Sequence, residues 1–437
     1  MVSRPVIRKA SYQPDNANSA PATGETSADE EKRLAEKFLI HRRLVPLVSQ
    51  NEDVLFLNAA SAPPSNLIVH EAITKYSADA LYGPHPHPKW RETKEDARRL
   101  LARVLNAEAP ETIAFTRDTT EGLGSFIRAA AATFRAGDNV VVVDNEHPNL
   151  AYGFLVLRDA GVEVRQVPTI AGAERTGRVE AVTAETLRPF VDERTRAIGI
   201  SSISFDGGQF NDVKGICAAF RHRGIHVLAD VSQHVGIARI DAQELRISAA
   251  AFSLHKGLNC PTGIGALYVS PAAFAEIGDP IPPIVNMAAV RNMNENLIVR
   301  ADEPVDMFPD ARRFEHANMS LAGVVAAAAF TRFYLDVLGP ADVEAHLYNL
   351  TDFLGIECDR LGIKILSPRD RDNRAPHICI LKLDQWEWAP YVKGHEGAVF
   401  TVNRLGIRVS FGFFNSFEDV RRLVQALEQV VARGLHV

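Results

Sequence analysis

The sequence predicts an α/β fold built on a largely parallel sheet, followed by a smaller α+β region. Between residues 139 and 270, short runs rich in valine, isoleucine and alanine alternate with amphipathic segments. This alternation is typical of buried parallel strands with helices on both faces. After about residue 310 a long alanine-rich segment and isolated strand-like runs replace it. The 437 residues, 46% of them hydrophobic, can bury the cores of about two or three domains.

Each expected element follows from its local pattern. The expected strands of the large sheet are 139–145, 162–168, 197–204, 226–231, 249–254 and 265–270. Helical periodicity marks 212–224, 320–339 and the capped segment 416–434, and strands are expected at 377–383 and 406–412. Polar, acidic and Ser/Asn/Pro-rich composition predicts a flexible tail at 1–30. We therefore expect a large domain at 31–310, with its 31–60 segment packed on a small domain at 311–437.

Composition excludes several classes of function. The net charge of −6, the pI near 6.2 and the lack of a basic cluster argue against a nucleic-acid partner. The four cysteines are scattered without CxxC spacing, which suits a reducing compartment such as the cytoplasm. No run reaches the roughly 18 apolar residues of a membrane span, and no signal peptide is evident. We expect a cytoplasmic protein with a small-molecule ligand and no membrane partner.

Chemically active residues gather where the expected strands end. In open parallel sheets, ligands bind beyond the carboxyl ends of the strands. The segments at these ends are "TRDTTEGL" (116–123), "DNEHPN" (144–149), "ADVSQH" (229–234) and "SLHKG" (253–257). Hydrogen-bonding groups, an aspartate and one lysine are therefore predicted to meet at one edge of the sheet.

In this order, these segments resemble the class V aminotransferase family of pyridoxal phosphate (PLP) enzymes, which includes cysteine desulfurases, isopenicillin N epimerase-like enzymes and C–S lyases. The matching runs extend from "FLNAASAPP" (56–64) to "IRVSFGFFNSFEDVRRLVQAL" (407–427). The resemblance implies PLP-dependent fold type I, like aspartate aminotransferase, with pyridoxal 5'-phosphate as cofactor. It also implies an amino-acid substrate and a homodimer with shared active sites.

The resemblance assigns Lys256 as the Schiff-base lysine and Asp230 as the carboxylate that keeps the pyridine nitrogen protonated, so that the ring acts as an electron sink. It assigns His147 to the ring face and Gln233 to the phenolic oxygen of the cofactor. Taken singly, each has a plainer explanation. A lysine at a strand edge is usually solvated, and an aspartate there often caps a helix. His147 suits an ordinary surface turn, and Gln233 suits the start of a helix.

The phosphate is assigned to Thr119 and Thr120, where a helix start provides free N–H groups, and to Ser253 and His255 beside the lysine. The same threonines would serve equally as a simple N-cap. In "RFEHAN" (313–318), Asn318 stands where many relatives have a threonine that reaches the phosphate of the neighbouring subunit. Asn318 can still donate a hydrogen bond, so we expect it to bind cofactor across the dimer.

Arg408 in "GIRVSF" corresponds to the family's arginine for the substrate α-carboxylate, whose planar fork fits a carboxylate bidentately. A strand arginine that extends to solvent is the alternative.

Two departures from the family pattern bear on the reaction. No cysteine lies between Cys379 and Arg408, where desulfurases carry a nucleophile, and both Cys358 and Cys379 fall inside expected secondary structure. In "SISFDGGQF" (202–210), Ser204 or Phe205 replaces the usual asparagine. We therefore favour a C–S lyase that works by β-elimination without a cysteine nucleophile, in specialised metabolism. An aminotransferase, epimerase or decarboxylating or deaminating enzyme is the alternative.

Three other functions are disfavoured. His85 and His87 in "YGPHPHPKW" lie two apart, but no further ligands accompany them, so no metal is expected, and with Trp90 they are candidates to shape a substrate pocket. A PLP-fold sensor would usually carry a DNA-binding module, and the tail has no helix-turn-helix pattern. A dinucleotide enzyme lacks support because "TEGLGSF" is not G-x-G-x-x-G.

Overall fold

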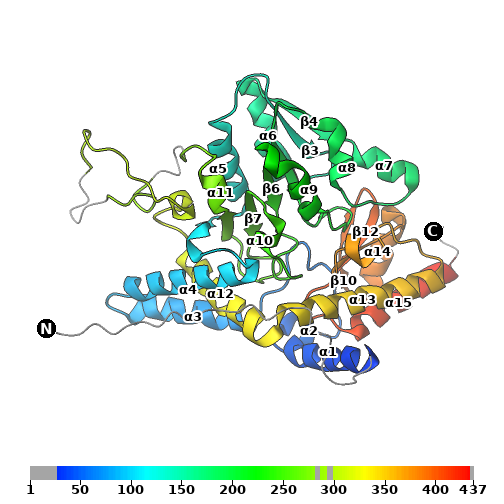
Figure 1. Cartoon of the computed structure of the whole chain (residues 1–437). Coiled ribbons are helices and arrows are strands. Elements are labelled where there is room, and N and C mark those ends of the chain that lie inside the picture. The colour runs from blue at the N-terminus through cyan, green and yellow to red at the C-terminus, as the bar shows by residue number, and fades with distance from the viewer. Residues whose placement is uncertain (1–26, 281–285, 293–298, 434–437) are drawn as a thin grey trace.

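The computed structural model describes residues 27–280, 286–292 and 299–433, and its centre is a seven-stranded sheet (Figure 1). The strand order is β2-β8-β7-β6-β5-β3-β4, and only β8 runs antiparallel to its neighbours. The strands are β2 (Ile113–Thr116), β3 (Asn139–Val143), β4 (Glu163–Val167), β5 (Thr195–Ser201), β6 (His226–Asp230), β7 (Ala249–Ser253) and β8 (Gly265–Val269).

Helices cover both faces of this sheet. Alternate strand residues belong to two separate core clusters: Val141 and Ile198 face one, Val140 and Ala197 the other. The helices are α1 (Ser27–Arg42), α2 (Pro46–Ser49), α3 (Leu67–Tyr82), α4 (His87–Leu105), α5 (Thr119–Ala131), α6 (Pro148–Leu155), α7 (Thr169–Thr176), α8 (Ala184–Leu187), α9 (Val213–Phe220), α10 (Ala242–Leu245), α11 (Pro271–Phe274), α12 (Leu321–Phe333), α13 (Pro340–Leu361), α14 (Gln385–Glu396) and α15 (Phe417–Ala432). Near-complete burial of both faces explains why the central strands are continuous apolar runs, whereas the edge strand β4 is largely exposed or half-buried and carries polar residues.

A second, antiparallel sheet lies toward the C-terminus. It consists of β11 (Thr401–Asn403), β12 (Gly406–Ser410) and β9 (Ile378–Leu381), in that order. Close by, β1 (Leu55–Phe56) pairs in parallel with β10 (Ala398–Val399), so an early segment joins the C-terminal region. Helix α1 also packs on α13, and Arg42 forms an ion pair with Asp419 at the start of α15.

The structure agrees with the expected elements in kind and differs at some of their ends. Every expected strand is present. Most are shortened by one or more residues, and the strand expected at 197–204 is shifted to Thr195–Ser201. The first strand of the sheet, β2, was not predicted because its four residues are too few for a periodic pattern. Residues 27–30, expected in the tail, form the first turn of α1, and residues 1–26 of that expected tail lie outside the described part.

The alanine-rich segment 320–339 is interrupted. Helix α12 ends at Phe333 and a π-helical turn, η6 (Tyr334–Leu338), follows. The stretch Leu321–Leu338 has the length and apolar composition of a membrane span, but half of it is buried in the fold, and α12 packs against α3 and α4. This packing is typical of a core helix.

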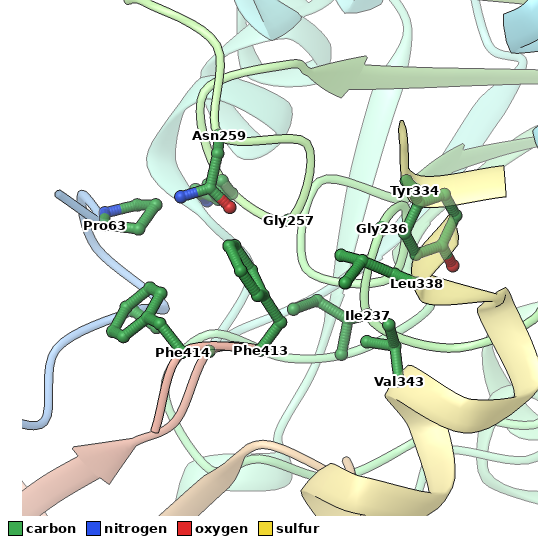
Figure 2. A pocket seen from close by; sticks show the side chains of 13 residues that line it. Pro63, Gly236, Ile237, Gly257, Asn259, Tyr334, Leu338, Val343, Phe413 and Phe414 are labelled. Carbon is green, nitrogen blue, oxygen red and sulfur yellow. The ribbon is translucent and has the colours of Figure 1, made fainter. Parts of the chain in front are cut away.

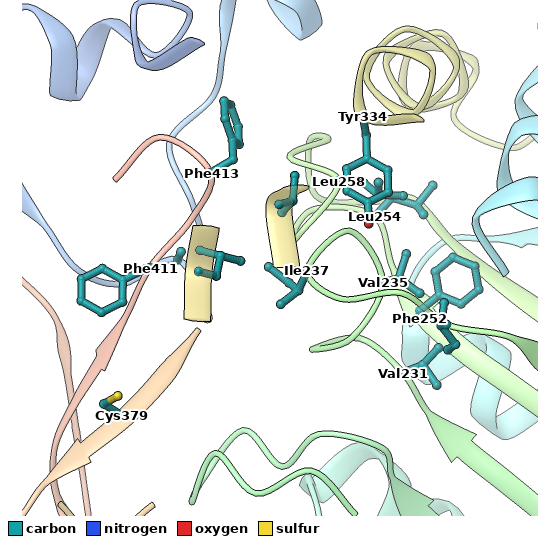
Figure 3. Packing of buried hydrophobic residues seen from close by; sticks show 14 of the residues in the cluster. Val231, Val235, Ile237, Phe252, Leu254, Leu258, Tyr334, Cys379, Phe411 and Phe413 are labelled. Carbon is teal, nitrogen blue, oxygen red and sulfur yellow. The ribbon is translucent and has the colours of Figure 1, made fainter. Parts of the chain in front are cut away.

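Apolar side chains fill the junction between the large sheet and the C-terminal region. Figure 3 shows Val231, Val235 and Phe252 on the side of the large sheet and Phe411 and Phe413, which follow β12, on the other side, with Ile237 between them. All of these side chains are buried in one continuous core. The ends of β6, β7 and β12 are therefore held in fixed positions relative to one another.

Candidate active site

Three polar side chains from three different strand ends meet at the carboxyl edge of the large sheet. His147 follows β3, Asp230 ends β6 and Lys256 follows β7. Their charges influence one another: the pKa of His147 is lowered by burial, raised by Asp230 and lowered by Lys256. The structure thus brings together the three residues that the sequence placed in the catalytic group.

Lys256 lies in an environment that disfavours its charged form. Burial lowers its pKa, the carboxylate of Asp230 opposes that shift, and the guanidinium of Arg408 adds to it. A desolvated amine near another cation is more often neutral and is a better nucleophile. The next residue must be glycine, because a Cβ on Gly257 would lie 2.3 Å from the carbonyl oxygen of Val235.

Asp230 is buried, with 8% of its surface exposed, and its position is fixed from its own loop. The N–H of Ser232 donates to Oδ1 at 2.9 Å, and the backbone carbonyl accepts from the N–H of Ser202. Asp230 is also the register partner of Ser201 on β5. It therefore does not serve as the cap of a following helix.

The threonines at the start of α5 are not its cap. Asp118 holds that position and accepts from the N–H of Glu121. Thr119 Oγ1 lies 3.0 Å from Ser232 Oγ, and Thr120 Oγ1 accepts from the amide of Asn149. The hydroxyls, together with the free N–H groups of the helix start, line an edge suited to an anion.

Ser253 offers the clearest unused hydrogen-bonding group at this edge. Its hydroxyl is buried and has no hydrogen-bond partner, which is uncommon in folded proteins. Its backbone N–H contacts Ser232 Oγ at 3.3 Å, so it adjoins the hydroxyls beside α5. His255, two residues on, has a pKa lowered by burial and by Lys256 and raised by Asp118. These residues fit a phosphate.

Arg408 projects from β12 and is also buried. One terminal nitrogen donates to the carbonyl of Phe205 at 2.8 Å, and the other lies 3.3 Å from Thr401 Oγ1. The buried Nε has no partner. The edge of the guanidinium formed by Nε and the weakly bonded nitrogen is suited to a carboxylate, so the structure does not favour the solvent-directed alternative.

Gln233 and His147 have local partners as well. Gln233 donates to the carbonyl of Ala60 at 2.8 Å, and its Oε1 pairs with His377 Nε2 at 3.1 Å. One hydrogen of its amide nitrogen remains for a ligand. His147 begins α6, where Nδ1 accepts from the N–H of Asn149, and its ring meets Phe205 edge-on at 5.1 Å.

Asn318 is not brought into this group. It is exposed after η5 (Ala311–Phe314), and no described hydrogen bond joins it to the residues beside α5. Its neighbour His316 contacts Glu121 Oε1 at 2.8 Å. His85 and His87 are exposed at the start of α4, and the described residues contain no cluster of three or more potential metal ligands.

All four cysteines are buried and free. Burial raises the pKa of Cys217 and Cys358 to about 12 and that of Cys379 to about 11, and it raises the pKa of Cys260 as well. Such thiols are rarely ionised at neutral pH and make poor nucleophiles. This agrees with the inference that no cysteine nucleophile serves the site.

The sequence analysis missed two buried residues at this edge. Glu146 directly precedes His147, and both its oxygens bond to Ser201. His377 precedes β9 and pairs with Gln233, and its environment includes Arg408 and Lys256. The position of Glu146 at a strand end was a usable signal. The contact of His377 depends on a segment more than a hundred residues away.

An apolar cavity, shown in Figure 2, has Lys256 among its lining residues. Its lining includes Gly236, Ile237 and Gly257 from the loops, Tyr334 from η6 and Phe413 after β12. Although Lys256 borders this cavity, Asp230, His147 and Arg408 do not. The charged groups, and not this cavity, therefore define the site.

The sheet carries a desolvated lysine and a buried aspartate at its carboxyl edge, and a buried hydroxyl without a partner lies near a helix start. These features are the ones that a PLP-dependent enzyme of fold type I requires. Comparison with known proteins gives the family. The Aminotransferase class-V model matches residues 54–423, so the chain belongs to that family.

Relatives and solved structures agree with this assignment. An uncharacterized aminotransferase of Schizosaccharomyces pombe is 42% identical over 390 residues, 89% of this chain and 95% of that protein. The apo structure of a cysteine desulfurase from Thermococcus onnurineus NA1 has a TM-score of 0.77 at 20% identity and covers 90% of this chain and 97% of its own. A complex of the cystine C-S lyase C-DES with cysteine persulfide has a TM-score of 0.75 at 19% identity, covering 88% and 98%. These two structures show a shared fold.

Proposed function

We propose that this PLP enzyme cleaves the Cβ–S bond of an S-substituted cysteine by β-elimination, without a cysteine nucleophile, in a specialised pathway of the cytoplasm. The observation that carries the choice against a desulfurase is the burial of all four thiols. The fold is compatible with either reaction, because a cystine C-S lyase and a cysteine desulfurase both share it.

The chain's own residues have distinct roles in this proposal. When bound, PLP supplies an electron sink for negative charge at the substrate Cα. Lys256 holds the cofactor and then moves the Cα proton. Asp230 holds a proton at the ring nitrogen, and His147 covers the ring face. The hydroxyls of Ser253, Thr119 and Thr120, with His255 and Gln233, position the remaining polar groups of the cofactor.

The substrate is held by its α-carboxylate. Arg408 presents Nε and one terminal nitrogen, while its other nitrogen is tied to the carbonyl of Phe205. A fixed carboxylate sets which Cα bond stands perpendicular to the ring, and that bond reacts. Ser204 or Phe205 replaces the asparagine that desulfurases usually have, and the ring of Phe205 packs edge-on against His147. Carboxylate recognition therefore falls mainly to Arg408.

A homodimer with shared sites remains part of the proposal. Asn318 is exposed and outside its own chain's site, as expected of a residue that serves a neighbouring subunit. Leu81 and Tyr82 at the end of α3 are 71% and 82% exposed, which supports a partner at that end of the molecule. Analytical ultracentrifugation of the wild-type protein tests this part directly.

Transamination is the second candidate, because the 42% identical S. pombe relative carries the description of an aminotransferase. Lys256, Asp230 and Arg408 serve both reactions. The two differ in products: elimination releases pyruvate, ammonia and a thiol, whereas transamination leaves the amino group on the cofactor.

One experiment separates these outcomes. Purified protein should be yellow, and borohydride should attach the cofactor covalently to Lys256, as peptide mass spectrometry would show. Incubation with S-substituted cysteines and a panel of amino acids should then give pyruvate and ammonia in equal amounts. A stoichiometric pyridoxamine form without pyruvate would instead establish transamination. A protein that takes up no PLP would refute the assignment of Lys256.

A further inference from the structure

Glu146 is a buried carboxylate that none of the roles above uses. It lies between the end of β3 and α6, with 8% of its surface exposed. Oε1 accepts from the N–H of Ser201 at 2.7 Å and Oε2 from its hydroxyl at 2.5 Å. Among the described residues, no basic side chain forms an ion pair with it. A carboxylate buried without a cation is costly, so its retention calls for a reason.

The neighbour of Glu146 across the sheet is Asp230. Ser201 ends β5 and is the register partner of Asp230 on β6, so one serine adjoins both carboxylates. Asp230 is held through Oδ1 by the N–H of Ser232 and is not bonded to Glu146. The two acids therefore interact through space and through Ser201, in a region from which water is largely excluded.

We infer that Glu146 is a positioning residue that acts through Asp230 to hold the proton at the ring nitrogen of the cofactor. An ionised Glu146 adds negative charge behind Asp230 and so favours the protonated, cationic ring nitrogen. When Glu146 is protonated, this negative charge is absent and the protonated ring nitrogen is less favoured. The inference rests on the proposed role of Asp230 and adds a second acid to it.

The groups around Glu146 allow this response near neutral pH. Burial raises its pKa to about 7, the hydrogen bonds from Ser201 and from the backbone of His147 oppose the shift, and the charge of Asp230 adds to it. The titratable groups around it are Asp230 on β6 and His147, the next residue in the chain, and Lys256 acts in turn on His147. Burial lowers the pKa of both His147 and Lys256, and neither of these described residues forms an ion pair with Glu146.

Glu146→Gln tests the inference. Glutamine has the same shape, can accept from the N–H of Ser201 and can donate to its hydroxyl, so the fold should be kept. The assay is the ¹⁵N chemical shift of ring-labelled pyridoxal phosphate bound to the protein, followed from pH 6 to pH 9. The ring nitrogen should lose its proton about one pH unit lower in the variant than in wild type, a tenfold change in proton affinity. Glu180→Gln, which changes an exposed carboxylate, should match wild type.

The outcomes separate this inference from the proposed function. If wild-type protein binds no labelled cofactor, both fail. If it binds cofactor but Glu146→Gln and wild type titrate alike, the role of Glu146 is overturned and that of Asp230 stands. An infrared carboxyl band that titrates near pH 7 in wild type and is absent from Glu146→Gln should accompany the shift. That band does not depend on activity, and its absence from wild type would also overturn the inference.

Discussion

Replacement of Ser253 by alanine should change stability and cofactor affinity in opposite directions. Without cofactor, its buried hydroxyl has no partner. An unsatisfied buried polar group destabilises the wild-type apo protein by about 1–3 kcal/mol, and alanine removes this group. The variant also loses a little packing, so apo Ser253→Ala should be more stable by about 1 kcal/mol in free energy of unfolding. A hydrogen bond to a charged group contributes about 1.5–3 kcal/mol, so the variant should bind PLP about 10- to 100-fold more weakly.

The measurements are urea unfolding of the apo protein and fluorescence titration with PLP. Ser248→Ala is the matched control, because Ser248 is fully buried near the other end of β7 but accepts from the N–H of Val227 at 3.0 Å. It should destabilise the apo protein by about 1–3 kcal/mol and leave PLP affinity unchanged. A Ser253→Ala protein that is less stable and binds PLP as wild type does would refute the phosphate assignment.

Three further predictions concern the substrate, the loop and acid stability. Arg408→Lys should lower kcat/KM for carboxylate substrates about 100-fold and leave the turnover of the corresponding amides little changed, with Arg404→Lys as the control. Equal losses on the carboxylate and on the amide substrates would contradict carboxylate binding by Arg408. Gly257→Ala should lower the free energy of unfolding by at least about 1–3 kcal/mol and weaken PLP binding, because the new Cβ would meet the Val235 carbonyl. The control Gly124→Ala, where the space around the Cβ is open, should stabilise α5 by about 0.5–1 kcal/mol in thermal unfolding. Burial lowers the pKa of His346 to about 4, so its contribution to stability is complete above about pH 6.5 and is lost as pH falls toward 4. Between pH 7 and pH 5, His346→Phe should therefore lose about 2 kcal/mol less free energy of unfolding than wild type. An equal loss in the two proteins would contradict the lowered pKa of His346.

Sequence patterns alone determined the layered α/β fold and the edge where the site lies. Periodicity reports burial directly, and polar groups after buried strands must meet at one edge when the strands are parallel. Lys256, Asp230 and His147 could therefore be placed at that edge from the sequence, whereas their roles rest on the family resemblance. The burial of Cys379 in a strand was correctly expected.

Only the tertiary structure decided which polar atoms have partners. The orphaned hydroxyl of Ser253, the free Nε of Arg408 and the pairing of Glu146 with Ser201 depend on distances between segments far apart in the chain. The exposed position of Asn318 is likewise a tertiary result. The physical reason is that strand periodicity follows from local burial, whereas hydrogen-bond satisfaction and shifted pKa values arise from contacts that folding alone creates.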